Sequence, residues 1–156
     1  MQVEIRDEHR WLEGFAGEWQ MLADPDAPPE ETTDDWHESG RMLETGSWLV
    51  IQSHGTMPGG GKAESILTLG FDASRGKYVG TWIGSMMDHL WVYEGLREGN
   101  ALVLNSVGPS WDRPGQMDSY QDIYTLDGPD ARSLKSQVLQ TDGTWKVFMN
   151  GKYRRK

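Results

Sequence analysis

The segment "AESILTLGFDASRGKYVGTWIG" (residues 63–84) contains two runs of β-branched, leucine and aromatic residues separated by a compact polar turn. Such residues are enriched in strands, because their side chains pack well on a pleated surface. The intervening "DASRG" (residues 72–76) has the aspartate, serine and glycine that are typical of turns. The segment therefore predicts two antiparallel strands joined as a hairpin.

The same pattern of short strand-like runs and turn residues extends over nearly the whole chain. Strands are expected at residues 18–22, 35–44, 47–57, 63–71, 77–84, 88–97, 101–108, 116–126, 132–140 and 144–155, with a long polar loop at residues 23–32. These ten runs have hairpin-length connections elsewhere and predict an all-β fold, a single antiparallel β-barrel of about ten strands. No linker or internal repeat interrupts them, so residues 1–156 are expected to form one domain.

The beginning of the chain has a different periodicity. Ile5, His9 and Leu12 recur at helical spacing, and Gly14 and Gly17 follow them. This arrangement predicts a short N-terminal helix that ends before the first strand.

Composition excludes several kinds of function. The chain of 156 residues has no cysteine, which excludes disulfides, thiolate zinc sites and a cysteine nucleophile. Its formal net charge of −9 argues against nucleic acid or an anionic membrane as a partner. No stretch approaches transmembrane length, and the first residues lack an apolar signal core. We therefore expect a soluble cytoplasmic protein.

Two tryptophans, a tyrosine, a histidine and two methionines lie close together in "GTWIGSMMDHLWVYEG" (residues 80–95). This stretch predicts a second hairpin, with its turn near residues 85–88. Side chains alternate between the two faces of a strand, and the mid-strand charge of Glu94 should face water. His89, Trp91 and Tyr93 are therefore expected inside the barrel.

A barrel of about ten strands is wider than side chains alone usually fill. We therefore expect a cavity that binds a small, partly apolar or aromatic ligand. The residues expected to line it are Trp82, His89, Trp91, Tyr93, His54, Tyr120 and Met149, with Met86 or Met87 at its rim. In the last strand Trp145, Val147 and Met149 are expected to share one face, whereas alternation leaves the inward face of residues 116–126 open.

The chain resembles the calycins, the group that includes lipocalins and fatty-acid-binding proteins. "FAGEWQ" (residues 15–20) places Gly17 and Trp19 as G-x-W at the entry to the first strand, and the last strand carries Arg154 and Arg155. The resemblance implies a lipocalin-like barrel in which one of these arginines packs across Trp19.

Longer motifs are similar to a bacterial family named domain of unknown function 1579 (DUF1579). They are "SGRMLETGSWLVIQSHG", "LTLGFDASRGKYVGTWIGSMMDHLWVYEG", "GPSWDRPGQMDSYQD" and "DGTWKVFMNGKYRRK", in this order. The family resemblance implies the lipocalin-like barrel and brings no established activity with it. "TLGFD" (residues 68–72) departs from the family, which more often has a tyrosine before the aspartate.

Several alternatives to a simple binding protein stay open. The four histidines lack zinc-type spacing, so no metal and no cofactor are expected, although a related barrel family binds haem through one histidine, for which His89 and His54 are the candidates. An enzyme could use the same cavity, with His89 or Tyr120 as acid or base in an isomerisation or cyclisation. A homodimer could form through Leu90, Val92 and Leu96, which alternation places on the opposite face from His89.

Overall fold

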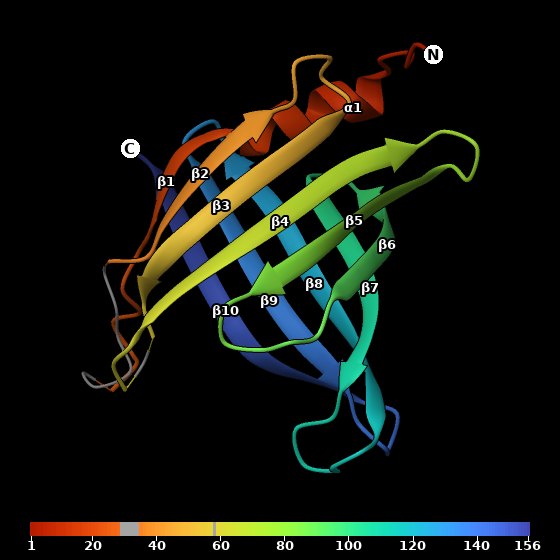
Figure 1. Cartoon of the computed structure of the whole chain (residues 1–156). Helices are drawn as coiled ribbons and strands as arrows, with labels where there is room; N and C mark the ends of the chain where they lie inside the picture. Colours follow the sequence, from red (N-terminus) through yellow and green to blue (C-terminus); the bar gives the residue numbers. More distant parts are fainter. Residues whose placement is uncertain (29–34, 58) are drawn as a thin grey trace.

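The computed structural model describes residues 1–28, 35–57 and 59–156 and contains a short helical segment followed by ten strands (Figure 1). The elements are α1 (Asp7–Leu12), the 3₁₀ helix η1 (Glu13–Phe15), β1 (Gly17–Met21), β2 (His37–Met42), β3 (Trp48–Thr56), β4 (Lys62–Asp72), β5 (Lys77–Gly84), β6 (Trp91–Glu98), β7 (Ala101–Pro109), β8 (Met117–Gly128), β9 (Ala131–Leu139) and β10 (Trp145–Arg155). Residues 29–32 of the predicted polar loop lie outside the described residues.

Each strand pairs antiparallel with its neighbours in sequence, and β1 pairs with β10, so the sheet closes into a barrel. This confirms the predicted all-β antiparallel barrel of ten strands with a short N-terminal helix. It is also consistent with the calycin-like barrel that the resemblance implied. No helix among the described residues is long and apolar enough to cross a membrane.

The predicted strand boundaries are close to the observed ones, with one difference that matters for the site. β6 begins at Trp91, whereas the sequence pattern predicted a start at residue 88. The connection between β5 and β6 therefore spans residues 85–90, and His89 lies in this connection rather than in a strand.

The hydrophobic core fills the end of the barrel that α1 and η1 cover. Leu12 and Phe15 are fully buried there and pack against leucine and tyrosine side chains from the strands. The strand residues of this cluster are Leu49, Ile51, Leu67, Leu69, Tyr78, Tyr93, Leu102, Leu104 and Tyr124. These buried side chains close this end of the barrel. Each fully buried side chain of this size contributes about 1.5–3 kcal/mol to stability.

Further from α1, the inward-facing positions of the same strands become small and polar. Ser53 of β3, Ser65 of β4, Ser106 of β7 and Ser136 of β9 are all buried. In β3, for example, Leu49 and Ile51 precede Ser53 on the inward face. The barrel interior therefore changes from apolar to polar along its axis.

Two arginines meet Trp19 where the barrel closes. Trp19 is fully buried, and the guanidinium carbon of Arg155 lies 4.3 Å from its ring centre. Arg155 also donates hydrogen bonds to the carbonyls of Ala16 and Gly14. The predicted arginine contact is thus confirmed for Arg155, whereas Arg132, whose guanidinium carbon is 5.0 Å from the same ring, was not foreseen.

Gly17 of the G-x-W motif has a specific reason to be glycine. Its φ of 102° is in the region that side chains disfavour, and a Cβ atom there would lie 2.4 Å from Nη1 of Arg155. The absence of a side chain at Gly17 therefore leaves room for Arg155 to lie across the ring of Trp19.

We expect Arg155→Met to lower the free energy of unfolding by about 1–3 kcal/mol, because it removes a partly buried cation–π contact, three hydrogen bonds to backbone carbonyls and an ion pair with Asp130. Arg154 lies on the opposite face of β10, so Arg154→Met should change stability by less than about 0.5 kcal/mol. Urea denaturation of both variants measures the difference. Equal losses would show that Arg155 has no special role at the closure.

Candidate functional site

The barrel wall forks between β6 and β7. Pairing between these strands runs from Glu98–Ala101 to Glu94–Asn105 and continues no further. By contrast, β5 pairs with β6 as far as Trp91, and β7 pairs with β8 as far as Pro109. Residues 91–93 and 106–109 are therefore each held by a neighbouring strand on one side only, and the two pairs of strands diverge.

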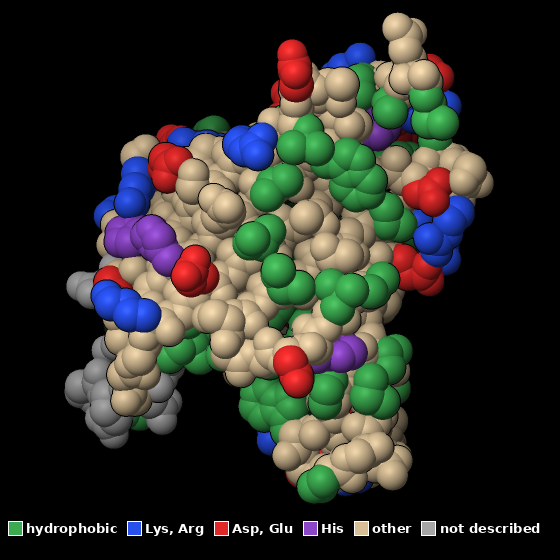
Figure 2. Space-filling model, viewed as in Figure 1, with side chains coloured by type: hydrophobic (Ala, Val, Ile, Leu, Met, Phe, Trp, Pro, Cys, Tyr) green, Lys and Arg blue, Asp and Glu red, His purple; other side chains and the backbone are tan. Residues whose placement is uncertain are grey.

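A pocket of about 970 Å³ lies over this fork and is open to solvent. Outward-facing side chains of β4 to β6 form part of its lining, β7 and β8 form another part, and the ends of β9 and β10 contribute the rest. The lining residues are Trp48, Thr68, Arg75, Val79, Gly80, Thr81, His89, Leu90, Val92, Tyr93, Glu94, Asn105, Ser106, Val107, Met117, Ser119, Tyr120, Leu139 and Trp145. Figure 2 shows hydrophobic side chains gathered on the face that β4, β5 and β6 present.

Inward-facing polar groups reach the pocket through the fork. Tyr93 and Tyr120 are buried, and Ser106 has only 7% of its surface exposed. The Tyr120 hydroxyl donates to the carbonyl of Pro109 at 2.6 Å, and burial raises its pKa. Ser106 lines the pocket, and its hydroxyl is buried without a hydrogen-bond partner among the described residues, which is unusual for a buried polar atom.

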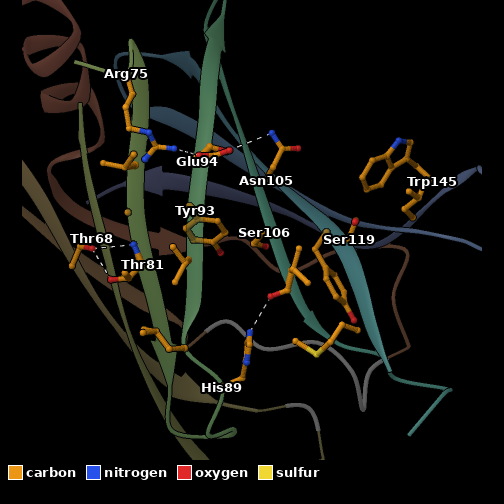
Figure 3. A pocket seen from close by; sticks show the side chains of 18 of the residues that line it. Thr68, Arg75, Thr81, His89, Tyr93, Glu94, Asn105, Ser106, Ser119 and Trp145 are labelled. Atoms are coloured by element: carbon orange, nitrogen blue, oxygen red, sulfur yellow. Dashed lines mark hydrogen bonds and ion pairs between the residues drawn. The ribbon is translucent and has the colours of Figure 1, made fainter. Parts of the chain in front are cut away.

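His89 and Trp91 brace the edge of the fork. Nε2 of His89 lies 3.0 Å from the carbonyl oxygen of Val107, which links the β5–β6 connection to β7 (Figure 3). The His89 ring meets Trp91 edge to face at 4.7 Å, and Trp91 meets Tyr120 in the same way at 4.9 Å. A Cβ atom on Gly108 would lie 2.2 Å from the Trp91 ring, so only glycine leaves room for this ring.

The structure brings together some of the predicted site residues and separates others. His89, Tyr93 and Tyr120 line the pocket, and Trp91 contacts two of them. Trp82 and Trp91 do not belong to the pocket lining, and both pack against the hydrophobic core. Whether any of these residues binds a ligand stays a prediction.

The predicted position of His54 inside the barrel is wrong. His54 is exposed and lies on the outer face of β3, where its ring meets that of His37. The inward face of β3 belongs to Ile51, Ser53 and Gly55, which are buried. Alternation alone assigns His54 to the outside once the buried leucine and isoleucine of this strand are identified.

The predicted sharing of one face in the last strand is also wrong, because the register of β10 shifts between Val147 and Met149. Trp145 and Val147 oppose Leu139 and Gln137, whereas Met149 opposes the buried Ser136. A bulge inserts one extra residue and so reverses which face the following side chains use. Met149 therefore points inward, with its sulfur 3.9 Å from the Ser136 hydroxyl, and does not line the pocket.

The face of residues 116–126 that alternation left open is decided by the core. Tyr120, Asp122 and Tyr124 face inward, and the Tyr93 hydroxyl donates to one carboxylate oxygen of Asp122. The Ser136 hydroxyl donates to the other oxygen at 2.5 Å. Burial raises the pKa of Asp122, and these two hydrogen bonds oppose that shift in part. Burial also raises the pKa of Tyr93 well above its ordinary value.

Sequence analysis did not identify the outward-facing and small residues of the site. Ser106, Asn105 and Val92 carry no motif, because their importance comes from the end of strand pairing between β6 and β7. The only sequence signal was the run of inward small residues, Ser106 and Gly108, at the end of a strand that begins with inward leucines.

The buried carboxylate of Asp122 should make the free energy of unfolding depend on pH. A raised pKa in the folded state means that the charged form destabilises the fold, and that this cost disappears as pH falls through the folded pKa towards the unfolded one. Asp122→Asn should therefore be most favourable, relative to the unmodified chain, near pH 7. The advantage should shrink as pH falls to about 4.

Urea denaturation at several pH values measures this difference in the free energy of unfolding. Each unit of pKa shift corresponds to about 1.4 kcal/mol. Asp127→Asn, at an exposed position of the same strand, is the control. A difference for Asp122→Asn that stays constant with pH would contradict a buried charge at this position.

The family comparison agrees with the fold. A family described as "Protein of unknown function (DUF1579)" matches residues 4–155. No curated protein matches the chain. The match covers the helix and all ten strands of the barrel. The chain therefore belongs to the DUF1579 family.

Proposed function

We propose that this protein binds a small, partly apolar molecule in the pocket over the fork between β6 and β7. The observation that carries the proposal is the pocket of about 970 Å³ itself, which is open to solvent where the pairing of β6 and β7 ends and has polar residues in a largely apolar wall. A ligand with an apolar body and a hydroxyl, carbonyl or carboxyl group would suit such a lining.

The size and lining of the pocket support a small-molecule ligand. Small-molecule sites typically have volumes of about 300–1,000 Å³, with mostly apolar walls and a few placed polar groups. Here the apolar wall includes Val92, Val107 and Met117, and the polar groups include Asn105 and Ser106. Aromatic surface from Trp48 and Trp145 suits a ligand with a flat ring.

The fold favours entry from the side of the barrel. The end near α1 is closed by Leu12 and Phe15. The fork interrupts the barrel wall, and the polar interior positions lie behind it. A ligand would therefore rest on the outer face of β6 and direct its polar end between the diverging strands.

The geometry gives less support to the two catalytic or cofactor readings. The Tyr120 hydroxyl already donates to Pro109, and its raised pKa makes it a poor base at neutral pH. Nε2 of His89 is engaged with the Val107 carbonyl, and His54 lies on the outer face of β3. An axial haem ligand needs a ring nitrogen directed at the iron, so these positions of His89 and His54 favour the haem reading less than a small-molecule ligand.

One valine and one leucine of β6, Val92 and Leu96, provide a matched test of ligand binding in the pocket. Val92 and Leu96 are both exposed on its outer face, at 60% and 54%, but only Val92 lines the pocket. Titration with dodecanoate, quercetin and indole should include one probe that quenches tryptophan emission saturably with micromolar affinity (about −8 kcal/mol). Val92→Asp should weaken that binding at least tenfold, whereas Leu96→Asp should leave it within about threefold.

The two variants change charge equally, so their difference isolates the pocket. Equal weakening in both would indicate binding to the general apolar surface rather than to this site. Failure of all probes, together with no retained small molecule in native mass spectrometry of protein from its own host, would contradict the proposal.

A second candidate function is self-association through the outer face of β6. Leu90, which directly precedes β6, and Val92 and Leu96 on its outer face are all more than half exposed, with Glu94 between the last two, and such exposed apolar side chains favour an interface. The partner we propose is a second copy of the chain, because a row along one strand can pair with itself about a twofold axis.

Sedimentation analysis over a range of concentrations tests this candidate. If the outer face of β6 is the dimer interface, Leu96→Asp should shift the chain from dimer to monomer by at least tenfold in dissociation constant. A monomer at high micromolar concentration without any substitution would rule the dimer out and leave ligand binding unaffected.

A further inference from the structure

The outer face of β2, β3 and β4 places two histidines and a glutamate in one row. His37 of β2 is paired directly with His54 of β3, and His54 is paired with Glu64 of β4. Directly opposed residues on antiparallel strands have Cβ atoms about 4.5–5.5 Å apart. The three side chains therefore stand next to one another although they are far apart in sequence.

The two imidazole rings have a separation that suits a shared metal ion. Their centres are 5.8 Å apart, with an angle of 69° between the ring planes. Two histidines bound to one zinc ion, each with a Zn–N distance of about 2.0–2.1 Å, have ring centres roughly 5–6 Å apart. Chelation by both rings therefore needs only small rotations of the side chains.

An unpaired nitrogen is the second observation at this place. Nδ1 of His37 is buried and has no hydrogen-bond partner in the part of the chain that the structure describes. Such a nitrogen costs stability unless something binds it, because a buried polar atom loses its contact with water. A histidine binds a metal ion through one ring nitrogen, and its other ring nitrogen then usually donates a hydrogen bond to a neighbouring group. Metal binding by His37 would therefore also change what its Nδ1 can bind.

The surrounding cleft has the charge that attracts a cation. It has a volume of about 250 Å³ and is lined by His37 and His54 together with three carboxylates and one lysine. Of the carboxylates, Glu38 is bound by Ser53 and Arg132, and Glu18 accepts a hydrogen bond from Ser39. Glu64 is exposed and stands beside His54, so its carboxylate is the one placed to complete a metal site.

We propose that His37 and His54 bind one divalent transition-metal ion, such as Zn²⁺, on the outer face of β2 and β3, with Glu64 and water as the remaining ligands. Within the described residues, no group of three histidine, aspartate or glutamate side chains is already arranged around a metal position. Glu64 must therefore turn towards the ion when it binds. The histidine pair supplies the chelate, and imidazole nitrogen is a ligand that Zn²⁺, Cu²⁺ and Ni²⁺ all accept.

This metal site is separate from the proposed ligand pocket. The pocket is lined from β4 through β10 with Trp48, and none of His37, His54 or the cleft carboxylates belongs to its lining. The metal proposal therefore does not depend on the proposed function.

Calorimetric titration of the untagged chain with ZnCl₂ tests the proposal. We expect one Zn²⁺ per chain, with at least tenfold weaker binding in His54→Ala and in His37→Ala, because each variant removes one arm of the chelate. Glu64→Gln should weaken binding by about threefold or more. His89→Ala is the matched control, since it removes a histidine elsewhere on the molecule, and it should bind Zn²⁺ like the unmodified chain.

His54 is exposed, so His54→Ala should keep the fold even if His37→Ala does not. Ring-proton NMR signals of the four histidines provide a direct readout in the unmodified chain. Zn²⁺ should shift those of His37 and His54 together and leave those of His9 and His89 in place. Absence of binding at millimolar Zn²⁺, unchanged affinity in His54→Ala, or shifts confined to His9 or His89 would each overturn the proposal.

Discussion

The closure of the barrel depends on Trp19. This side chain is fully buried at the pairing of β1 with β10, and it contacts the guanidinium groups of both Arg132 and Arg155. Arg155 also donates to the carbonyls of Gly14 in η1 and of Ala16 just before β1, so this side chain connects the helical segment, the first strand and the last strand. Without this closure, β1 and β10 would present free edges, which closed barrels avoid.

The second arginine connects the closure to the polar part of the interior. Arg132 is completely buried, lies 4.3 Å from the ring of Tyr153 and forms an ion pair with Glu38. Among residues 1–28, 35–57 and 59–156, its Nε and Nη1 atoms have no hydrogen-bond partner. Since a buried charge must be balanced, the carboxylate of Glu38 is committed to Arg132 and to Ser53 although Glu38 also borders the cleft of His37 and His54. The inner and outer faces of one strand thus have different electrostatic roles.

At the fork, β6 and β7 stop pairing at Glu94 and Asn105, although each strand stays paired on its other side. The polar and small residues behind it, such as Ser106 and Gly108, would pack poorly in a closed apolar core, and the aromatic rings of Trp91 and Tyr120 occupy the space that they leave. The end of pairing between β6 and β7 therefore explains both the packing of these rings and the opening in the barrel wall. The side chains that stabilise the fork are also those that would face a ligand.

The sequence by itself determined the ten strands, the short helix and the contact between Trp19 and an arginine, because these follow from local patterns: strand-forming runs, turn residues and G-x-W. It also determined the inward position of Tyr93, since the charge of Glu94 fixes the other face. Only the tertiary structure decided the bulge that turns Met149 inward, the outer position of His54 and the extent of β6–β7 pairing. These depend on the register between strands, which is set by contacts across the whole barrel. The pairing of His37 with His54 is intermediate: the predicted strands at residues 35–44 and 47–57, with two residues between them, imply it, but only the folded hairpin brings the two rings together.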